Sequence, residues 1–199
     1  MMKLLVATGN EGKLRELVQL LAPLDLDVMG LDQLDNPPVV AEDGATFADN
    51  ARKKALTLAR FSGCLTLADD SGLCVDVMDG APGVFSARYA GEQGDDKANN
   101  ARLVRELGDI PLNQRKAHFH CCIALAWPDG RCETVEGRVD GLIIDQQRGS
   151  HGFGYDPLFL VPEYGKTMAE LPADIKNRIS HRGRALQKIV PLLKTIVQD

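Results

Sequence analysis

The feature that most constrains the fold is a series of short apolar runs that stop at polar, glycine-containing segments. Residues 3–7 end at Thr8-Gly9-Asn10, and residues 65–68 run straight into Asp69-Asp70-Ser71-Gly72. After the first run, apolar side chains recur at helical spacing over residues 14–21. Strand-like runs that alternate with amphipathic helices predict an α/β fold.

Antiparallel pairing is expected in the middle of the chain. Residues 118–127 and 132–139 are β-like and flank the turn Pro128-Asp129-Gly130, which predicts a hairpin. Residues 73–78 form another apolar run, which we expect to be a strand separate from residues 65–68. The chain is therefore predicted to form a central mixed β-sheet with flanking helices.

Two further helices have sequence signals. Thr46 and Asp49 form a capping-box pattern before a helical stretch. The stretch from Gly183 onward is helical in pattern, and Pro191 is expected to kink or divide it.

Composition limits the classes of function. The 199 residues, 44% of them hydrophobic, suit one domain over 1–199. The net charge of −5 argues against nucleic-acid binding, and no apolar run approaches membrane-spanning length. The apolar start is too short for a signal peptide, so the cytoplasm is the expected compartment. Without a Cys-x-x-Cys pair, the cysteines are predicted to be buried free thiols: Cys64, Cys74, Cys121, Cys122 and Cys132.

The loop after the first apolar run has the features of a phosphate site. A helix N-terminus presents unpaired N–H groups and the positive end of a dipole. Gly9 and Gly12 allow close approach of the backbone, and Lys13 can place a charge on a ligand. The Walker A spacing is absent. The alternative is an Asn10 N-cap with a solvated Lys13.

Asp69 and Asp70 end the second apolar run. Because neighbours in an extended chain point to opposite faces, the two carboxylates are expected to have different roles. One can face a cleft as a Mg²⁺ ligand or general base, while the other anchors the loop. The alternative is a polar turn with a local Asp cap.

Three further segments give weaker signals. Glu42-Asp43-Gly44 is acidic, and Asn50 and Lys54 share one helix face. Glycines and aromatic residues interleave over 149–157, which favours stacking of a planar ligand. Lys176 and residues 180–183 form a cationic cluster at a predicted helix start. Each also suits an ordinary loop, exposed helix face or cap.

Five motifs together resemble one family, the inosine/xanthosine triphosphate pyrophosphatases, which remove non-standard purine nucleotides. The motifs lie in the family's order and cover essentially the whole chain. They are Thr8-Gly9-Asn10 with Lys13, Ala68-Asp69-Asp70-Ser71-Gly72-Leu73, Ala81-Pro82-Gly83-Val84-Phe85-Ser86-Ala87-Arg88-Tyr89, Gly152-Phe153-Gly154-Tyr155-Asp156-Pro157 and Ser180-His181-Arg182-Gly183.

The resemblance implies two lobes around a long nucleotide-binding cleft, a homodimer, and Mg²⁺-dependent hydrolysis of ITP, dITP and XTP to the monophosphate and pyrophosphate. It implies that Asp70 is the proton acceptor and a metal ligand. Glu42 is the second metal-side carboxylate, although Asp43 stays open as the alternative. The residues implied to bind the substrate are Thr8, Gly9, Asn10, Glu11, Gly12, Lys13, Lys54, Ser71, Phe153, Gly154, Tyr155, Asp156, Lys176, His181 and Arg182.

Selectivity follows from the base. Inosine and xanthosine carry a 6-keto acceptor where adenosine carries an amino donor. Donors such as Arg182 or loop N–H groups are expected to read this difference, and such a mismatch can discriminate by ~10⁴. Two other functions stay open: a nucleotide-binding regulatory module without turnover, and a phosphatase that releases orthophosphate.

Overall fold

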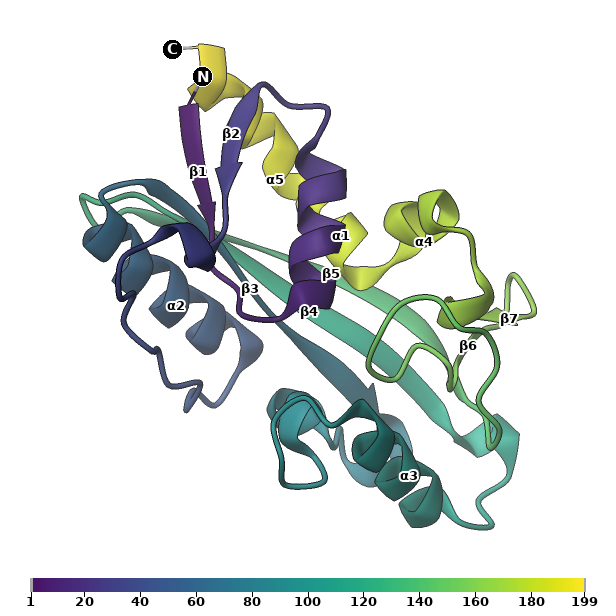
Figure 1. Cartoon of the computed structure of the whole chain (residues 1–199). Helices are drawn as coiled ribbons and strands as arrows, with labels where there is room; N and C mark the ends of the chain where they lie inside the picture. Colours follow the sequence, from purple (N-terminus) through teal and green to yellow (C-terminus); the bar gives the residue numbers. More distant parts are fainter. Residues whose placement is uncertain (1, 199) are drawn as a thin grey trace. The chain divides into compact units, whose positions relative to one another are not determined.

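The computed structural model describes residues 2–198, with side chains described up to residue 196. Figure 1 shows the helices and strands along the chain. In order, the strands, α-helices and longest 3-10 helix are β1 (Met2–Val6), α1 (Glu11–Leu21), β2 (Leu26–Met29), α2 (Phe47–Ser62), β3 (Leu65–Val75), the 3-10 helix η3 (Gly83–Arg88), α3 (Asp96–Leu107), β4 (Lys116–Ala126), β5 (Cys132–Ile143), β6 (Phe159–Val161), β7 (Lys166–Thr167), α4 (Ala173–Ile179) and α5 (His181–Gln198).

The strands form one mixed sheet, in the order β2-β1-β3-β4-β5-β6-β7. β1 runs parallel to β2 and to β3, whereas β5, β6 and β7 pair antiparallel. β4 and β5 are neighbours, and their turn is closed by a bond from Trp127 N–H to the Arg131 carbonyl at 3.0 Å. The predicted mixed sheet and its hairpin are confirmed.

The prediction of two strands around an Asp-Asp turn is wrong. β3 is one strand of 11 residues, and Asp69-Asp70-Ser71-Gly72 lies inside it. Polar residues are tolerated there because charged and amide groups from α1, α2 and α5 contact the two aspartates. Residues 76–78 leave the strand and form a 3-10 turn instead.

The residues group into two compact units that alternate along the chain. Unit 1 contains 1–70, 121–137 and 182–199, and unit 2 contains 71–120 and 138–181. β3, β4 and β5 each contribute residues to both units.

Unit 1 has a core on each face of its strands. On one face α2 buries Ala51, Ala55 and Leu58 with Leu5 and Cys122. On the other face, α1 and α5 pack against the alternate strand residues. Figure 1 shows both helices on the opposite side of the strands from α2. Period-two alternation of the strands explains why both adjacent cysteines, Cys121 and Cys122, are buried.

Unit 2 has a core of its own. Leu103 and Leu107 of α3 are buried with Leu73, Phe119 and Phe159 from the strands. Each fully buried side chain of this size stabilises the fold by about 1.5–3 kcal/mol. This packing fixes the position of α3. The position matters because α3 contacts the loop that follows β5.

The helix predictions are mostly confirmed. Thr46 and Asp49 form the complete capping box of α2. α5 begins at His181, two residues before the predicted start, and Pro191 lies within it without dividing it. Apolar residues on both sides of the proline, including Ile189 and Leu193, are buried in the unit 1 core and hold the helix together.

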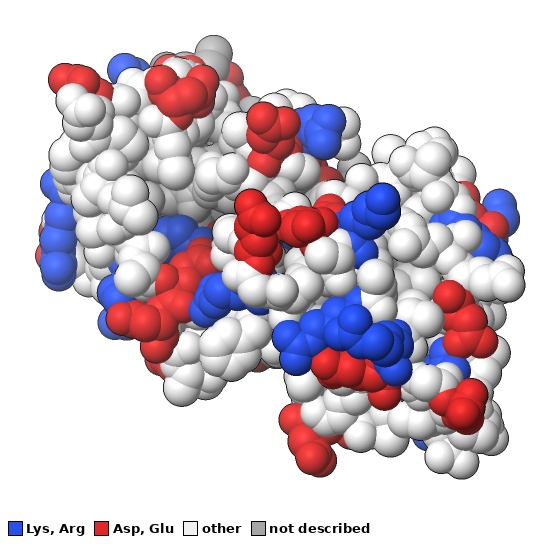
Figure 2. Space-filling model, turned by 60° about the horizontal axis from the view of Figure 1, so that its bottom comes forward, with Lys and Arg blue, Asp and Glu red and all other residues white. Residues whose placement is uncertain are grey.

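All five cysteines are free thiols, as predicted. Their predicted burial holds for Cys121 and Cys122 but is wrong for Cys64, Cys74 and Cys132, which are partly exposed because they lie at or near strand ends. Among residues 2–198, no helix is long and apolar enough to cross a membrane. On the face in Figure 2, Lys and Arg side chains are interspersed with Asp and Glu side chains.

Candidate functional site

The turn between β1 and α1 is an Asn-capped helix start. Asn10 Oδ1 accepts from the Lys13 N–H at 3.0 Å, and Thr8 Oγ1 accepts from the Asn10 N–H at 3.2 Å. The N-cap expectation is therefore confirmed. Lys13 is not simply solvated, because its Nζ lies 3.2 Å from Asp69 Oδ2 and its side chain is only 14% exposed.

Asp69 is the fully buried anchor of this region. Arg182 Nε and Nη2 donate to its Oδ2 at 3.2 and 3.1 Å, and Lys13 lies on the same oxygen. Burial by itself would raise the pKa of Asp69, but the charges of Lys13, Arg182 and Lys54 outweigh it and hold that pKa well below its usual range. Asp69 therefore stays charged and fixes the cations around it.

Arg182 continues this network to α1. It is 1% exposed, and its Nη1 donates to Glu16. Burial lowers its pKa, but the carboxylates of Asp69 and Glu16 outweigh burial and raise the pKa above its usual value. Its contacts thus join α5, β3 and α1. Its predicted contact with the base stays a prediction.

Asp70 points to a different set of partners. Its Oδ2 accepts from Asn50 Nδ2 of α2 at 2.9 Å, and the residue is 5% exposed. Burial raises the pKa of Asp70, and the nearby Glu42 carboxylate raises it further, against the lowering effect of Lys13, Asn50 and Lys54. The two adjacent acids thus have different partners, and their expected difference in role stays a prediction.

Lys54 connects α2 to the Glu42 carboxylate and to the backbone of Asp69. Its Nζ donates to Glu42 Oε1 at 2.5 Å and to the Asp69 carbonyl at 3.0 Å. Burial lowers the pKa of Lys54, but the charges of Asp69 and Glu42 outweigh it and raise the pKa. Lys54 is therefore a charged ammonium, 9% exposed, on the same side of α2 as Asn50.

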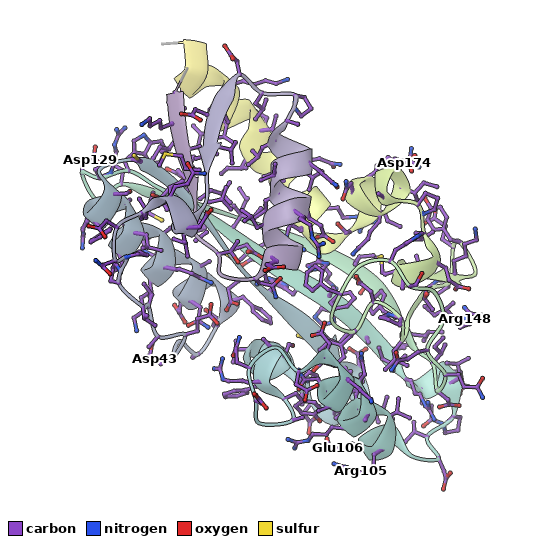
Figure 3. The ribbon with its side chains drawn as sticks, in the orientation of Figure 1. Asp43, Arg105, Glu106, Asp129, Arg148 and Asp174 are labelled. Carbon is purple, nitrogen blue, oxygen red and sulfur yellow. The ribbon has the colours of Figure 1, made fainter. Side chains whose placement is uncertain are left out.

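The two acids before α2 differ clearly. Asp43 pairs with the exposed Lys53 at 2.6 Å and lies in the loop that precedes α2 (Figure 3). Glu42 instead contacts Lys54, and its charge reaches Asp70. Glu42 is thus the acid whose charge acts on Asp70, and its place at the metal stays a prediction. In residues 2–198, no group of three or more His, Cys, Asp or Glu side chains is placed to hold a metal ion.

Unit 2 carries the glycine-rich segment with its two aromatic residues. Asp156 Oδ2 accepts from the Phe153 N–H at 3.0 Å and from Lys176 Nζ at 2.5 Å. Lys176 Nζ also lies 5.4 Å from the centre of the Phe153 ring. Gly152 is required here because its φ is +81° and a Cβ would meet Asp156 Oδ2 at 2.1 Å.

The remaining predicted residues of unit 2 are held by packing and by backbone groups. Tyr155 Oη donates to the Ser86 carbonyl at 2.8 Å, and burial raises the pKa of this phenol. His181 stacks on Phe119 with ring centres 4.8 Å apart. Ser71 directly follows Asp70 in β3 and is half-buried.

Unit 1 thus brings together the predicted phosphate loop and the residues Glu42, Lys54 and Asp70. Unit 2 brings together Phe153, Gly154, Tyr155, Asp156 and Lys176. Sequence reasoning assigned no site role to Glu16, Asp96 or Asn100, which contact these groups. Glu16 lies three residues after Lys13, and Asp96 lies four before Asn100, so helical spacing was the available signal.

Known proteins resemble this chain over nearly its whole length. A dITP/XTP pyrophosphatase of Desulforamulus reducens is 53% identical over 98% of this chain and 97% of its own length. One from Geobacter sulfurreducens is also 53% identical, over 94% of each chain. The solved structure of a HAM1 protein from Coxiella burnetii is 38% identical and superposes with a TM-score of 0.88, over 98% of this chain and all of the other.

The family comparison agrees with the resemblance found in the sequence motifs. The Ham1 family pattern matches residues 4–192, which include the predicted phosphate loop, the paired acids of β3 and the glycine-rich segment. The chain belongs to the Ham1 family.

Proposed function

We propose that this protein hydrolyses the non-standard purine nucleotides dITP, ITP and XTP to the nucleoside monophosphate and pyrophosphate. The observation that carries the proposal is the placement of Asp70. Its buried carboxylate, with a raised pKa, lies where the charges of Lys13, Lys54 and Glu42 act on it. Relatives at 53% identity that are named dITP/XTP pyrophosphatase support the choice of substrate.

Asp70 is the proton acceptor in this proposal. The carboxylate takes a proton from water, the water oxygen bonds to the α-phosphorus, and the bond to the bridging oxygen breaks so that pyrophosphate leaves. A raised pKa makes the carboxylate a stronger base, which suits this role. Asn50 supports it, because its amide donates to Asp70 Oδ2 and fixes the orientation of the group.

Lys13 and Lys54 carry the positive charge for the phosphates. Each ammonium has three N–H donors. Two donors of Lys54 bind Glu42 and the Asp69 carbonyl, and these bonds fix its position. Together with the α1 N-terminus, the two cations would stabilise the charge that develops on the leaving pyrophosphate.

Glu42 and Asp70 are the residues that would hold Mg²⁺. They fit a hard cation, because two carboxylates close enough for one to raise the pKa of the other gain from a shared divalent charge. Mg²⁺ usually binds through one or two protein carboxylates, waters and substrate phosphates. When bound, it would neutralise phosphate charge and orient the reacting group.

The base is assigned to unit 2. The half-buried Phe153 ring offers a face for stacking, and Lys176 supplies a donor next to it. A donor of this kind suits a 6-keto group and opposes the 6-amino group of adenine. A homodimer, taken from the family resemblance, and a cytoplasmic location, which suits the five free thiols, complete the proposal.

The test is a product analysis with a panel of triphosphates. The purified protein is incubated with dITP, ITP, XTP, dATP or dGTP and Mg²⁺, and pyrophosphate, orthophosphate and monophosphate are quantified. The proposal predicts equal amounts of monophosphate and pyrophosphate from the first three nucleotides and far less from the last two. A parallel series with EDTA, followed by added Mg²⁺, is expected to lose and then regain turnover.

Orthophosphate as the main product would replace the proposal with a phosphatase. Binding of dITP without any product would indicate a regulatory module. Equal turnover of dATP and dITP would refute the assigned selectivity while leaving the bond that is cleaved unchanged.

A further inference from the structure

The segment that carries Phe153 is held by α3 at one residue. The N–H of Gly154 donates to Asp96 Oδ2 at 2.7 Å, and the carbonyl of Gly154 accepts from Asn100 Nδ2 at 2.9 Å. Asp96 and Asn100 are four residues apart and share a helix face. Both backbone groups of Gly154 are thus fixed by one helix, which is itself anchored in the unit 2 core.

Gly154 needs these two hydrogen bonds to stay in one backbone conformation. Its φ of +61° lies in the left-handed region, and a glycine loses more conformational freedom on ordering than any other residue. Its two neighbours are bonded as well: the Phe153 N–H donates to Asp156 and the Tyr155 hydroxyl to the Ser86 carbonyl, and both backbone carbonyls accept from N–H groups further along the segment. Gly154 is the point at which α3 bonds to this segment, so its conformation contributes to the direction of the Phe153 ring.

Stability alone does not explain an asparagine at position 100. The residue is 4% exposed, and its Oδ1 is buried without a hydrogen-bond partner among the described residues. A buried acceptor without a partner is unfavourable, and an apolar side chain of similar size would avoid that penalty. What the asparagine supplies in return is the donor to the Gly154 carbonyl.

We propose that Asp96 and Asn100 are positioning residues for the nucleobase, which hold Gly154 so that the Phe153 ring is set for stacking. This inference rests on the proposed function. The N–H groups of Phe153 and Gly154 both donate to carboxylates of the chain, so the segment presents the ring face rather than these two donors. Because stacking barely distinguishes one purine from another, the positioning changes the affinity for all purine nucleotides alike.

The experiment compares variants at both positions with matched controls. Asn100→Asp and Asn100→Leu remove the donor at nearly constant size, and Asp96→Ala removes the exposed acceptor. Asp96→Asn keeps an acceptor oxygen and is the conservative rescue. Arg105→Ala, in the last turn of α3 (Figure 3), is the control on the same helix. KM and kcat for dITP and XTP are measured by pyrophosphate release, together with Tm.

Without the hydrogen bonds to Gly154, the Phe153 side chain and its segment are free to move before the nucleotide binds. The entropy lost when binding orders them corresponds to about a tenfold rise in KM. We expect this rise for both nucleotides in the two Asn100 variants and in Asp96→Ala, with kcat within about twofold of wild type. Asp96→Asn and Arg105→Ala are expected to keep the wild-type KM. A merely structural role would lower Tm without changing KM.

Unchanged KM in folded Asn100 variants, or a rise for one of the two nucleotides only, would overturn the inference. If Asn100 variants do not fold, Asp96→Ala decides, because Asp96 is exposed. If the wild type releases no pyrophosphate, that result contradicts the proposed function, and the positioning role is tested by ligand binding instead. Calorimetric titration with ITP then decides the inference: about tenfold weaker binding by Asp96→Ala than by wild type supports it, and equal or absent binding by both proteins overturns it.

Discussion

Arg182→Met tests the buried ion network that organises unit 1. In the wild type the guanidinium binds Asp69 twice and Glu16 once, and Arg182 and Asp69 are 1% and 0% exposed. The substitution keeps most of the side-chain volume but removes both bonds from the guanidinium to Asp69 Oδ2, which Lys13 also contacts. Removing one partner of a buried pair destabilises a protein by about 3–5 kcal/mol.

The assay is urea unfolding at neutral pH. With an m value of about 2–3 kcal/mol per molar urea, a loss of about 4 kcal/mol lowers the midpoint by about 1–2 M. Lys53→Met is the matched control, because Lys53 pairs with Asp43 at the surface, where their side chains are 43% and 70% exposed. Such a surface pair contributes about 0–1 kcal/mol, so this variant is expected to shift the midpoint by less than about 0.5 M.

The double variant Asp69→Asn/Arg182→Met separates the network from simple packing loss. It removes the buried carboxylate together with its cation, so its loss of free energy of unfolding is expected to be smaller than the sum of the two single losses. The reasoning is refuted if Arg182→Met shifts the midpoint no more than Lys53→Met does, or if the two single losses simply add.

Three further predictions follow from the pKa shifts and from the glycine-rich segment. The lowered pKa of Asp69 stabilises the protein at pH values above the pKa of this group in the unfolded chain, about 3.9. The stability advantage of wild type over Asp69→Asn is therefore expected to shrink as pH falls below about 4. Urea unfolding between about pH 6 and 2 checks this, and a constant difference contradicts it. The raised pKa of Asp70 has the opposite effect on stability: its contribution is present below the pKa of the unfolded chain and is lost as pH rises through the pKa of the folded protein. Asp70→Asn is therefore expected to have a higher Tm than wild type at neutral pH but not below about pH 4. Gly152→Ala places a methyl group against Asp156 and Lys176 at a φ of +81°, and we expect KM for dITP to rise by about 5- to 150-fold, the equivalent of about 1–3 kcal/mol; an unchanged KM would show that the Asp156–Lys176 pair tolerates the methyl group.

Local signals were sufficient for much of the fold. The capping box at Thr46 and Asp49, the hairpin turn after β4 and the alternating helices and strands depend on neighbouring residues, and the sequence therefore predicted them. β3 was divided wrongly because two adjacent aspartates resemble a turn. They lie inside a strand because partners distant in the sequence, Lys13 and Arg182, neutralise Asp69.

In the candidate site, too, local patterns predicted some features and contacts distant in the sequence determined the others. The opposite directions of Asp69 and Asp70 follow from strand geometry and were predicted from it. Which of them is buried in an ion network depends on side chains 113 residues away, as in the bond from Arg182 to Asp69. The support of Gly154 by Asp96 and Asn100 spans 58 and 54 residues; helical spacing predicts that the two residues share a face, but it does not identify Gly154 as their partner.

The central claim is that Asp70, and not its fixed neighbour Asp69, acts on the reacting water. The most direct test is kcat for pyrophosphate release from dITP by Asp70→Asn, with saturating Mg²⁺ and with folding confirmed by Tm. Asparagine keeps the size of the group and an acceptor for Asn50 but cannot take a proton, so we expect kcat to fall by about 10²–10⁴ while dITP still binds. A kcat within about threefold of wild type would contradict the assignment, since a general base contributes far more than that.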